Sequence, residues 1–193
     1  MQANQWEDLI TRAAANRVSP IKAQTYRNKK WGSASAPVVL GCDDGNDYVV
    51  KGQQAGRAIV NEQIVGKLGV ALKAPVGQVN LIDVPADLIG MQADLKHIPA
   101  GVSHGSHLIP DCSDRQWLAH QDVPDNRLRF AALAVLYGWI PAGDHQLIYS
   151  QTAPHLVYSV DHGHFFPGGP NWTATGLGGA GSSVLYVGTD DRL

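Results

Sequence analysis

Apolar and polar residues alternate in the manner of β-strands in the stretch between residues 21 and 51. The pattern predicts strands over residues 21–27, 36–42 and 48–51. Asp-Asp-Gly-Asn at residues 43–46 separates the last two, and Gly and Asn tolerate the positive φ of a tight turn. We therefore expect residues 38–42 and 48–51 to pair as an antiparallel hairpin.

Helical spacing of apolar residues follows in two longer segments. Residues 58–68 carry Val60, Ile64 and Leu68 at positions i, i+4 and i+8, which predicts a helix with this stripe toward the core. Residues 127–140 are apolar on nearly every face but are too few to span a bilayer. We expect that segment to form a helix buried in a core.

The other segments have weaker patterns. They predict a helix over 6–15, strands over 75–82 and 88–91, mostly loop over 93–125 with a short helix at 115–120, a second hairpin from 147–149 and 156–160, and a strand at 183–187. This order of strands, helices and loops predicts an α+β fold in two lobes.

Composition narrows the class of protein. The 193 residues, 44% of them apolar, suffice for one domain or for two small lobes that share a cleft. A net charge of −2, from 17 acidic and 15 basic residues, argues against a nucleic-acid or membrane partner. The two cysteines, Cys42 and Cys112, exclude a disulfide scaffold and a four-thiolate zinc site. No signal pattern and no long apolar run are present, so we expect a cytoplasmic protein.

Lys51 stands at the end of a strand that is predicted to be buried. A buried lysine is costly unless its amine reaches solvent, a carboxylate or a ligand anion. Glu62 lies opposite the apolar stripe of the 58–68 helix and is placed to point across the sheet to Lys51. The alternative is a lysine that reaches solvent and a solvated glutamate.

A run of small residues precedes the second strand: Gly32, Ser33, Ala34 and Ser35. Small side chains let backbone N–H groups approach a phosphate closely. The run lacks the Walker pattern GxxxxGK[ST], so it is not a P-loop. Many such runs are ordinary loops, and this reading stays open beside the phosphate-binding one.

Two aspartates follow apolar segments in the second half. Asp144 comes after the 127–140 helix, and Asp161 comes directly after the strand at 156–160. A carboxylate at a strand exit is a common position for a magnesium ligand in phosphate chemistry. Both positions also suit aspartates that stabilise turns.

His162 and His164 offer a third type of chemistry. On a strand, histidines at i and i+2 share one face, which suits zinc in a metal-dependent hydrolase. The neighbouring Gly and Phe-Phe indicate a turn instead, and no third ligand has an obvious spacing.

Taken in order, these pieces resemble the HipA-like kinase family, over about residues 18–167. The resemblance is carried by Gly32-Ser-Ala-Ser35, the hairpin ending at Lys51, Asn61-Glu62, Tyr137-Gly-Trp-Ile140, Gly143-Asp144 and Val160-Asp161-His-Gly163. It implies one kinase-like domain over residues 1–193. An antiparallel N-lobe sheet would occupy about residues 18–92, and a reduced helical C-lobe about residues 93–193.

The resemblance also implies roles for the candidate residues. Backbone amides of Gly32, Ser33, Ala34 and Ser35 would cover the phosphates of ATP. Lys51 would bind the α- and β-phosphates and be held by Glu62. Asp144 would orient the substrate hydroxyl, on a protein Ser or Thr, and Asp161 would ligate Mg²⁺. The segment after Asp83, into residues 93–105, would border the adenine.

The sequence departs from the family in three ways that bear on activity. Pro141 and Ala142 precede Asp144, where relatives tend to carry polar loop residues. The position of the second metal ligand, usually Asn, is Tyr149, and Gln146 or His145 would have to substitute. The chain also ends about 30 residues after Asp161, where related kinases continue with further helices. An inactive pseudokinase or an interaction module is therefore the alternative. An apolar patch left open by a short C-lobe would be covered by a partner or a second copy.

Overall fold

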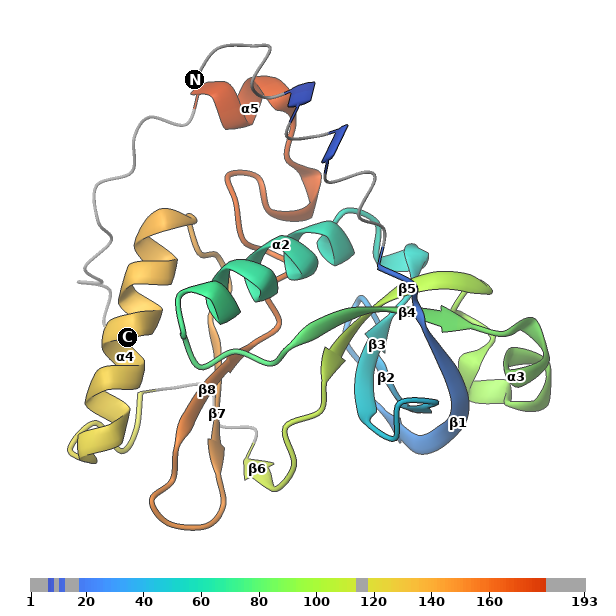
Figure 1. Ribbon diagram of the computed structural model, residues 1–193, viewed down its shortest axis with the longest axis horizontal. Helices are drawn as coiled ribbons and strands as arrows, with labels where there is room; N and C mark the ends of the chain where they lie inside the picture. The colour runs from blue at the N-terminus through green and yellow to red at the C-terminus, as the bar shows by residue number, and fades with distance from the viewer. Residues whose placement is uncertain (1–6, 9–10, 13–17, 114–117, 180–193) are drawn as a thin grey trace.

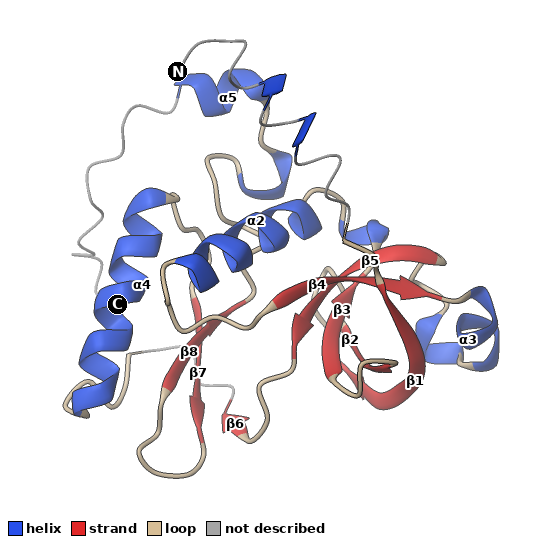
Figure 2. Ribbon diagram, in the orientation of Figure 1, coloured by secondary structure: helices blue, strands red, loops and turns tan. Residues whose placement is uncertain are grey.

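The computed structural model describes residues 7–8, 11–12, 18–113 and 118–179, which form a mixed α+β structure (Figures 1 and 2). The strand expected at 183–187 lies outside these residues. The helices expected over 6–15 and 115–120 lie largely outside them as well. In the described part, no helix has the length and apolar character needed to cross a membrane.

Five strands close into a barrel in the order β1-β2-β3-β5-β4. Their bounds are β1 (Ile21–Lys30), β2 (Val38–Cys42), β3 (Asp47–Lys51), β4 (Val79–Val84) and β5 (Gly101–His107). The sheet is antiparallel, as expected, at four pairs of strands, whereas β1 runs parallel to β4 where the barrel closes. The predicted hairpin of β2 and β3 is confirmed, with Val38 opposite Val50 and Gly45 at a φ of 82° in the turn.

The apolar side chains of these strands fill the barrel. Leu40, Tyr48, Val50 and Ile82 are almost wholly buried there. The outer face of β3 and β5 is different in character, since Lys51 and His104 are paired across the two strands and both are buried. The barrel therefore has an apolar interior and one polar face.

Two short segments differ from their predictions. Residues 88–91 belong to helix α3 (Ala86–Met91), which begins after Pro85. Residues 101–107, expected to be loop, form β5. Residues 88–91 are a short apolar run, and such a run fits a strand and a helix equally well. Residues 101–107 are rich in Gly, Ser and His, so they lack the apolar alternation that predicts a strand.

Helix α2 (Ala58–Ala71) lies between the barrel and helix α4 (Figure 1). Its expected apolar stripe is wrong at two of three positions: Val60 and Ile64 are 42% and 41% exposed, whereas Leu68 packs against the core beside α4. The polar Asn61 and Glu62 are buried instead. Gly66 explains this rotation in part, because a Cβ there would lie 2.4 Å from Val79 Cγ1. Close backbone approach thus brings the polar face of the helix inward, where it finds partners.

A second sheet of three strands lies beside α4 (Pro124–Trp139). Its strands are β6 (Cys112–Ser113), β7 (Gln146–Ser150) and β8 (Val157–Val160), and the predicted hairpin of β7 and β8 is confirmed. Leu133, Leu136 and Tyr137 of α4 pack in its core. The prediction that α4 is buried all round is wrong, because Leu128 and Trp139 are 76% and 65% exposed.

Short helical segments complete the described chain. They are the 3₁₀ turns η1 (Gln53–Ala55), η2 (Ala93–Leu95) and η3 (Gly169–Asn171) and helix α5 (Ala174–Gly179). One contact of this region matters for the site below: η3 and Trp172 lie against the start of α2.

Candidate functional site

A cavity of about 420 Å³ opens between the barrel and the second sheet. This volume lies within the range of small-molecule sites. Its lining comes from segments far apart in sequence: Lys29, Trp31, Gly32, Ser33, Pro37, Val49, Lys51, Glu62, Gly77, His104, Ser106, His107, Leu108, Ile109, Cys112, Gln146, Ile148, Ser159, Val160, Asp161 and His162. The lining is polar near Lys51 and largely apolar near Leu108, so the cavity has two chemically different ends.

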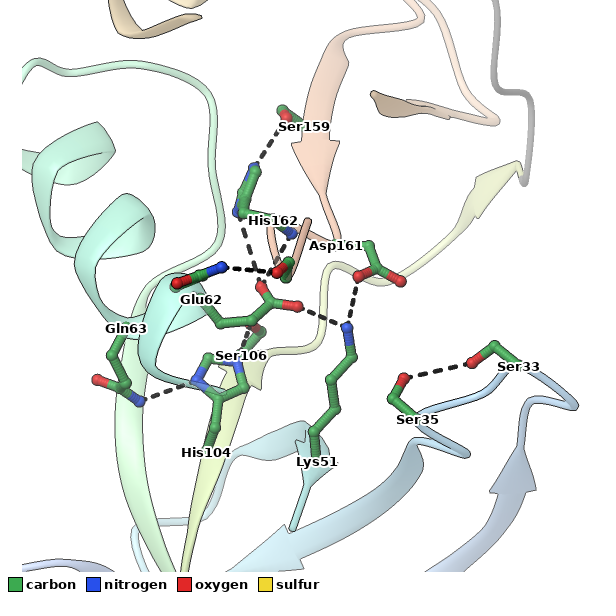
Figure 3. Close-up of polar contacts among 12 residues, drawn as sticks. Ser33, Ser35, Lys51, Glu62, Gln63, His104, Ser106, Ser159, Asp161 and His162 are labelled. Carbon is green, nitrogen blue, oxygen red and sulfur yellow. Dashed lines mark hydrogen bonds and ion pairs between the residues drawn. The ribbon is translucent and has the colours of Figure 1, made fainter. Parts of the chain in front are cut away.

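Lys51 is the centre of the polar end (Figure 3). Its Nζ lies 2.5 Å from Glu62 Oε1 and 2.6 Å from Asp161 Oδ1, so it bridges α2 and the residue after β8. Lys51 and Glu62 are 5% and 1% exposed, whereas the Asp161 side chain is partly open to the cavity. The expected contact of Lys51 with Glu62 is therefore present, and the solvated alternative is wrong for both residues.

The ion pairs, more than burial, decide the protonation states of Lys51 and Glu62. Burial alone would lower the pKa of Lys51, but the carboxylates of Glu62 and Asp161 outweigh it and raise that pKa above its usual value. Burial likewise would raise the pKa of Glu62, but the cation of Lys51 outweighs it and holds that pKa well below its usual range. Both groups are thus charged at neutral pH, and the cation is held at the floor of the cavity.

The second oxygen of Glu62 is also held. The backbone N–H of His162 donates to Glu62 Oε2 over 3.1 Å. The His162 ring lies 2.9 Å from Ser159 Oγ, which accepts a 2.6 Å hydrogen bond from Tyr137 of α4. Burial lowers the pKa of His162, so its ring is neutral. A buried polar chain therefore links α4 to Glu62 and fixes the carboxylate that holds Lys51.

Asn61 anchors the chain that follows Asp161, a role that sequence reasoning missed. Its Nδ2 lies 2.8 Å and 2.9 Å from the carbonyl oxygens of Gly163 and Phe165, and 3.3 Å from that of Gly169. Its Oδ1 accepts a hydrogen bond from Trp172 Nε1 at 2.9 Å. In the sequence, the only indication of this contact was the position of Asn61 directly before Glu62 on a predicted helix.

Replacing Asn61 with Ala is expected to lower the free energy of unfolding by about 1–3 kcal/mol, because it leaves buried carbonyl groups without a donor. Urea unfolding followed by tryptophan fluorescence measures the change. Asn171→Ala removes an exposed amide of the same segment and should change stability by less than about 0.5 kcal/mol. Equal, small effects of the two variants would contradict the anchoring role.

Asp161 and Gln146 lie at neighbouring places on the cavity wall. Strand register sets Gln146 opposite Val160, the residue before Asp161, and both Gln146 and Asp161 line the cavity. Carboxylate and amide oxygens are ligands that magnesium accepts, with bound phosphate and water supplying the rest. The residues present therefore fit a magnesium ion that arrives with a phosphate ligand.

Tyr149 does not face this site. It is buried on β7, and its hydroxyl accepts a hydrogen bond from the Ala119 backbone N–H at 3.0 Å. Of the two residues expected to substitute for it, Gln146 lines the cavity and His145 does not, since its ring packs against Tyr137.

The small-residue run forms the loop between β1 and β2. Gly32 and Ser33 line the cavity, whereas Ala34 and Ser35 are not part of its wall. A turn bond from the Ala36 N–H to the Ser33 carbonyl shapes the loop, and the hydroxyls of Ser33 and Ser35 lie 3.4 Å apart. Half of the run is thus placed to meet a ligand at the polar end.

Asp144 lies on the loop between α4 and β7. It is exposed and is not part of the cavity lining. The loop packs closely on the segment after Asp161: the Phe166 N–H donates to the Pro141 carbonyl, and a Cβ on Gly143 would lie 2.8 Å from the His164 carbonyl oxygen. Asp144 therefore lies on a loop that packs against the chain three to five residues after Asp161.

The apolar end is not built by the segment that was expected. Residues 93–105 contribute only His104 to the lining, which belongs to the polar end. Val49, Leu108, Ile109 and Ile148 provide the apolar surface. Leu108 and Ile109 belong to the connection between β5 and β6, which crosses from the barrel to the second sheet. This connection therefore borders the apolar end of the cavity.

The zinc alternative finds no support in the described residues. Among them, no group of three or more His, Cys, Asp or Glu side chains could hold a metal ion. His162 is buried with Ser159 as its ring partner, and His164 is exposed.

Comparison with known proteins identifies a related family. The model of a family described as HipA-like kinase matches residues 26–166, which include the barrel from the second half of β1 onward, α2, α4 and every residue of the site named above except Trp172 and Gly169. A search of curated proteins found no match.

Proposed function

This chain belongs to the HipA-like kinase family, and we propose that it binds ATP with Mg²⁺ in the cavity and transfers the γ-phosphate to a hydroxyl group, such as that of a protein Ser or Thr. The observation that carries the proposal is the buried cation of Lys51, held between Glu62 and Asp161 on the cavity wall. Phosphoryl transfer depends on positioning and charge neutralisation, which this group is suited to provide.

The two ends of the cavity suggest how the nucleotide lies. Lys51, Asp161 and Gln146 at the polar end would face the phosphates, under the loop of Gly32 and Ser33. The apolar end around Leu108 would take the base. In this proposal the barrel and the second sheet with α4 act as the two lobes of a kinase-like fold, and the bound Mg²⁺ neutralises phosphate charge.

Each of the site residues would then have a separate role in binding the nucleotide or transferring the phosphate. Lys51 binds the α- and β-phosphates through Nζ, and Glu62 keeps that amine in place. Asp161 and Gln146 hold the metal through side-chain oxygens. The Asp144 carboxylate accepts the hydroxyl proton of the substrate, and its exposed position suits a substrate that approaches from outside the cavity.

A pseudokinase is the second candidate, favoured by one observation. Tyr149 is buried where the family places its second metal ligand, so the substitute is Gln146, a neutral amide from the start of β7. Such a protein would bind ATP and transfer no phosphate.

Two further expectations belong to the proposal. One is a cytoplasmic location, in line with the free thiols of Cys42 and Cys112. The other is a partner protein or a second copy of this chain bound to the exposed face of α4.

ATP with Mg²⁺ is expected to stabilise the protein, since a ligand that binds only the native state adds RT ln(1 + [L]/Kd). At about a hundred times Kd this amounts to about 2.7 kcal/mol. A thermal-shift titration with ATP, with and without Mg²⁺, measures it, and a radiolabelled transfer assay on candidate proteins follows. Binding without transfer favours the pseudokinase, and no shift with any nucleotide contradicts both candidates.

A further inference from the structure

Strand β5 places a serine and a histidine side by side on the cavity wall, and neither has a role in the proposal above. His104 and Ser106 lie on the same face of β5, since they are two residues apart, and both line the cavity. His104 Nε2 lies 2.9 Å from Ser106 Oγ, and His104 Nδ1 lies 2.9 Å from the side-chain nitrogen of Gln63 on α2 (Figure 3).

The hydrogen bonds of Gln63 fix which nitrogen of His104 carries the proton. Gln63 Nε2 lies 2.8 Å from the carbonyl oxygen of Asn80, so this atom is the amide nitrogen, a donor only. It therefore donates its other hydrogen to His104 Nδ1, which must be unprotonated. Burial lowers the pKa of His104 to about 4, so the ring is neutral and its single proton lies on Nε2.

The direction of the next hydrogen bond follows. His104 Nε2–H donates to Ser106 Oγ, so the hydroxyl hydrogen of Ser106 cannot point back at the ring. Within the described residues no protein acceptor takes that hydrogen. Ser106 thus presents a hydrogen-bond donor, held by a buried relay, on the wall of the cavity.

The register of the barrel shows which end of the cavity this donor faces. Lys51 pairs with His104, and Val49 pairs with Ser106. Ser106 is therefore two residues, or about 6.6 Å along the strand, from the level of Lys51 and toward the apolar end. Its neighbours on the wall include Val49 and Leu108, and the ring of a base would pack on those side chains.

We propose that Ser106 donates a hydrogen bond to a ring nitrogen of the bound purine, and that His104 and Gln63 are positioning residues that hold its hydroxyl in the donor orientation. This inference rests on the nucleotide binding proposed above. It makes Ser106 a specificity residue, because a base with C–H in place of that acceptor nitrogen loses the hydrogen bond.

The test compares ATP with 1-deaza-, 3-deaza- and 7-deaza-ATP, each with Mg²⁺, by calorimetric titration of the wild type and Ser106→Ala. At least one analogue should bind the wild type about five- to tenfold more weakly than ATP, and Ser106→Ala should bind that analogue and ATP equally. Ser106→Thr keeps the hydroxyl and should keep the discrimination. Nitrogen-15 NMR of the histidine rings, assigned with His104→Gln, should find the His104 proton on Nε2.

Several results would overturn the inference. If Ser106→Ala discriminates among the four nucleotides as the wild type does, another group reads the base. A His104 proton on Nδ1 would remove the donor argument. ATP binding by the wild type with no discrimination among the analogues defeats this inference alone, whereas no ATP binding by the wild type defeats the proposed function with it.

Discussion

Asp161→Asn is expected to lower the rate of phosphate transfer by a factor of at least about a hundred, the scale on which loss of one charge-stabilising group affects catalysis. Asn has almost the shape of Asp and lacks the negative charge that holds the metal. The Asp161 side chain is partly exposed on the cavity wall, so the fold should tolerate the change. Magnesium should then add little to the stabilisation by ATP in a thermal-shift titration.

A matched control separates the metal role from a general loss of charge. Asp122→Asn changes an exposed aspartate outside the cavity lining and should leave both the rate and the magnesium effect unchanged. A fully active Asp161→Asn protein would show that the metal is held elsewhere. Loss of ATP binding in the absence of magnesium would instead assign Asp161 a role through its ion pair with Lys51.

Local patterns were enough to predict the hairpins and the two long helices. The β2–β3 hairpin has two short runs of mostly apolar residues separated by a Gly-Asn turn, and the β7–β8 hairpin also has two short apolar runs. Lys51 and Glu62 were also recognisable, because a lysine at the end of a buried strand needs a partner. The contact of Lys51 with Asp161, which is 110 residues further along the chain, depends on how the barrel meets the second sheet.

The parts that could not be predicted depend on long-range packing. β5 is polar and Gly-rich, and it becomes a strand because β3 and β4 both pair with it as the barrel closes. Helix α2 turns Asn61 and Glu62 inward because each finds hydrogen-bond partners on the chain after β8. An amphipathic pattern predicts which apolar side chains of a helix are buried. It cannot predict that a polar face is buried when the hydrogen-bond partners of that face come from distant parts of the chain.

Lys51→Met is expected to lower the free energy of unfolding by about 3–5 kcal/mol at pH 7, in addition to abolishing transfer. The methionine fills similar space, but Glu62 then remains buried and charged with the His162 N–H as its donor and no cation beside it. Urea unfolding of the protein without nucleotide measures the loss. Lys51→Met combined with Glu62→Gln removes both charges and should recover most of the stability.

The pH dependence distinguishes an unpaired charge from simple loss of packing. In the wild type, Lys51 holds the pKa of Glu62 below its usual value, so this contribution to stability is present at neutral pH and is lost as the pH falls below the range in which an unfolded glutamate ionises. In Lys51→Met, burial without the cation raises the pKa of Glu62, so the variant regains stability on protonation as the pH falls. The difference between the two proteins should therefore shrink from pH 7 to about pH 4.5. The result would contradict this account if the difference in the free energy of unfolding stayed constant over this pH range, or if the double variant did not reduce it. Lys51 would then stabilise the fold by packing, and the buried Glu62 carboxylate would not be the source of the lost stability.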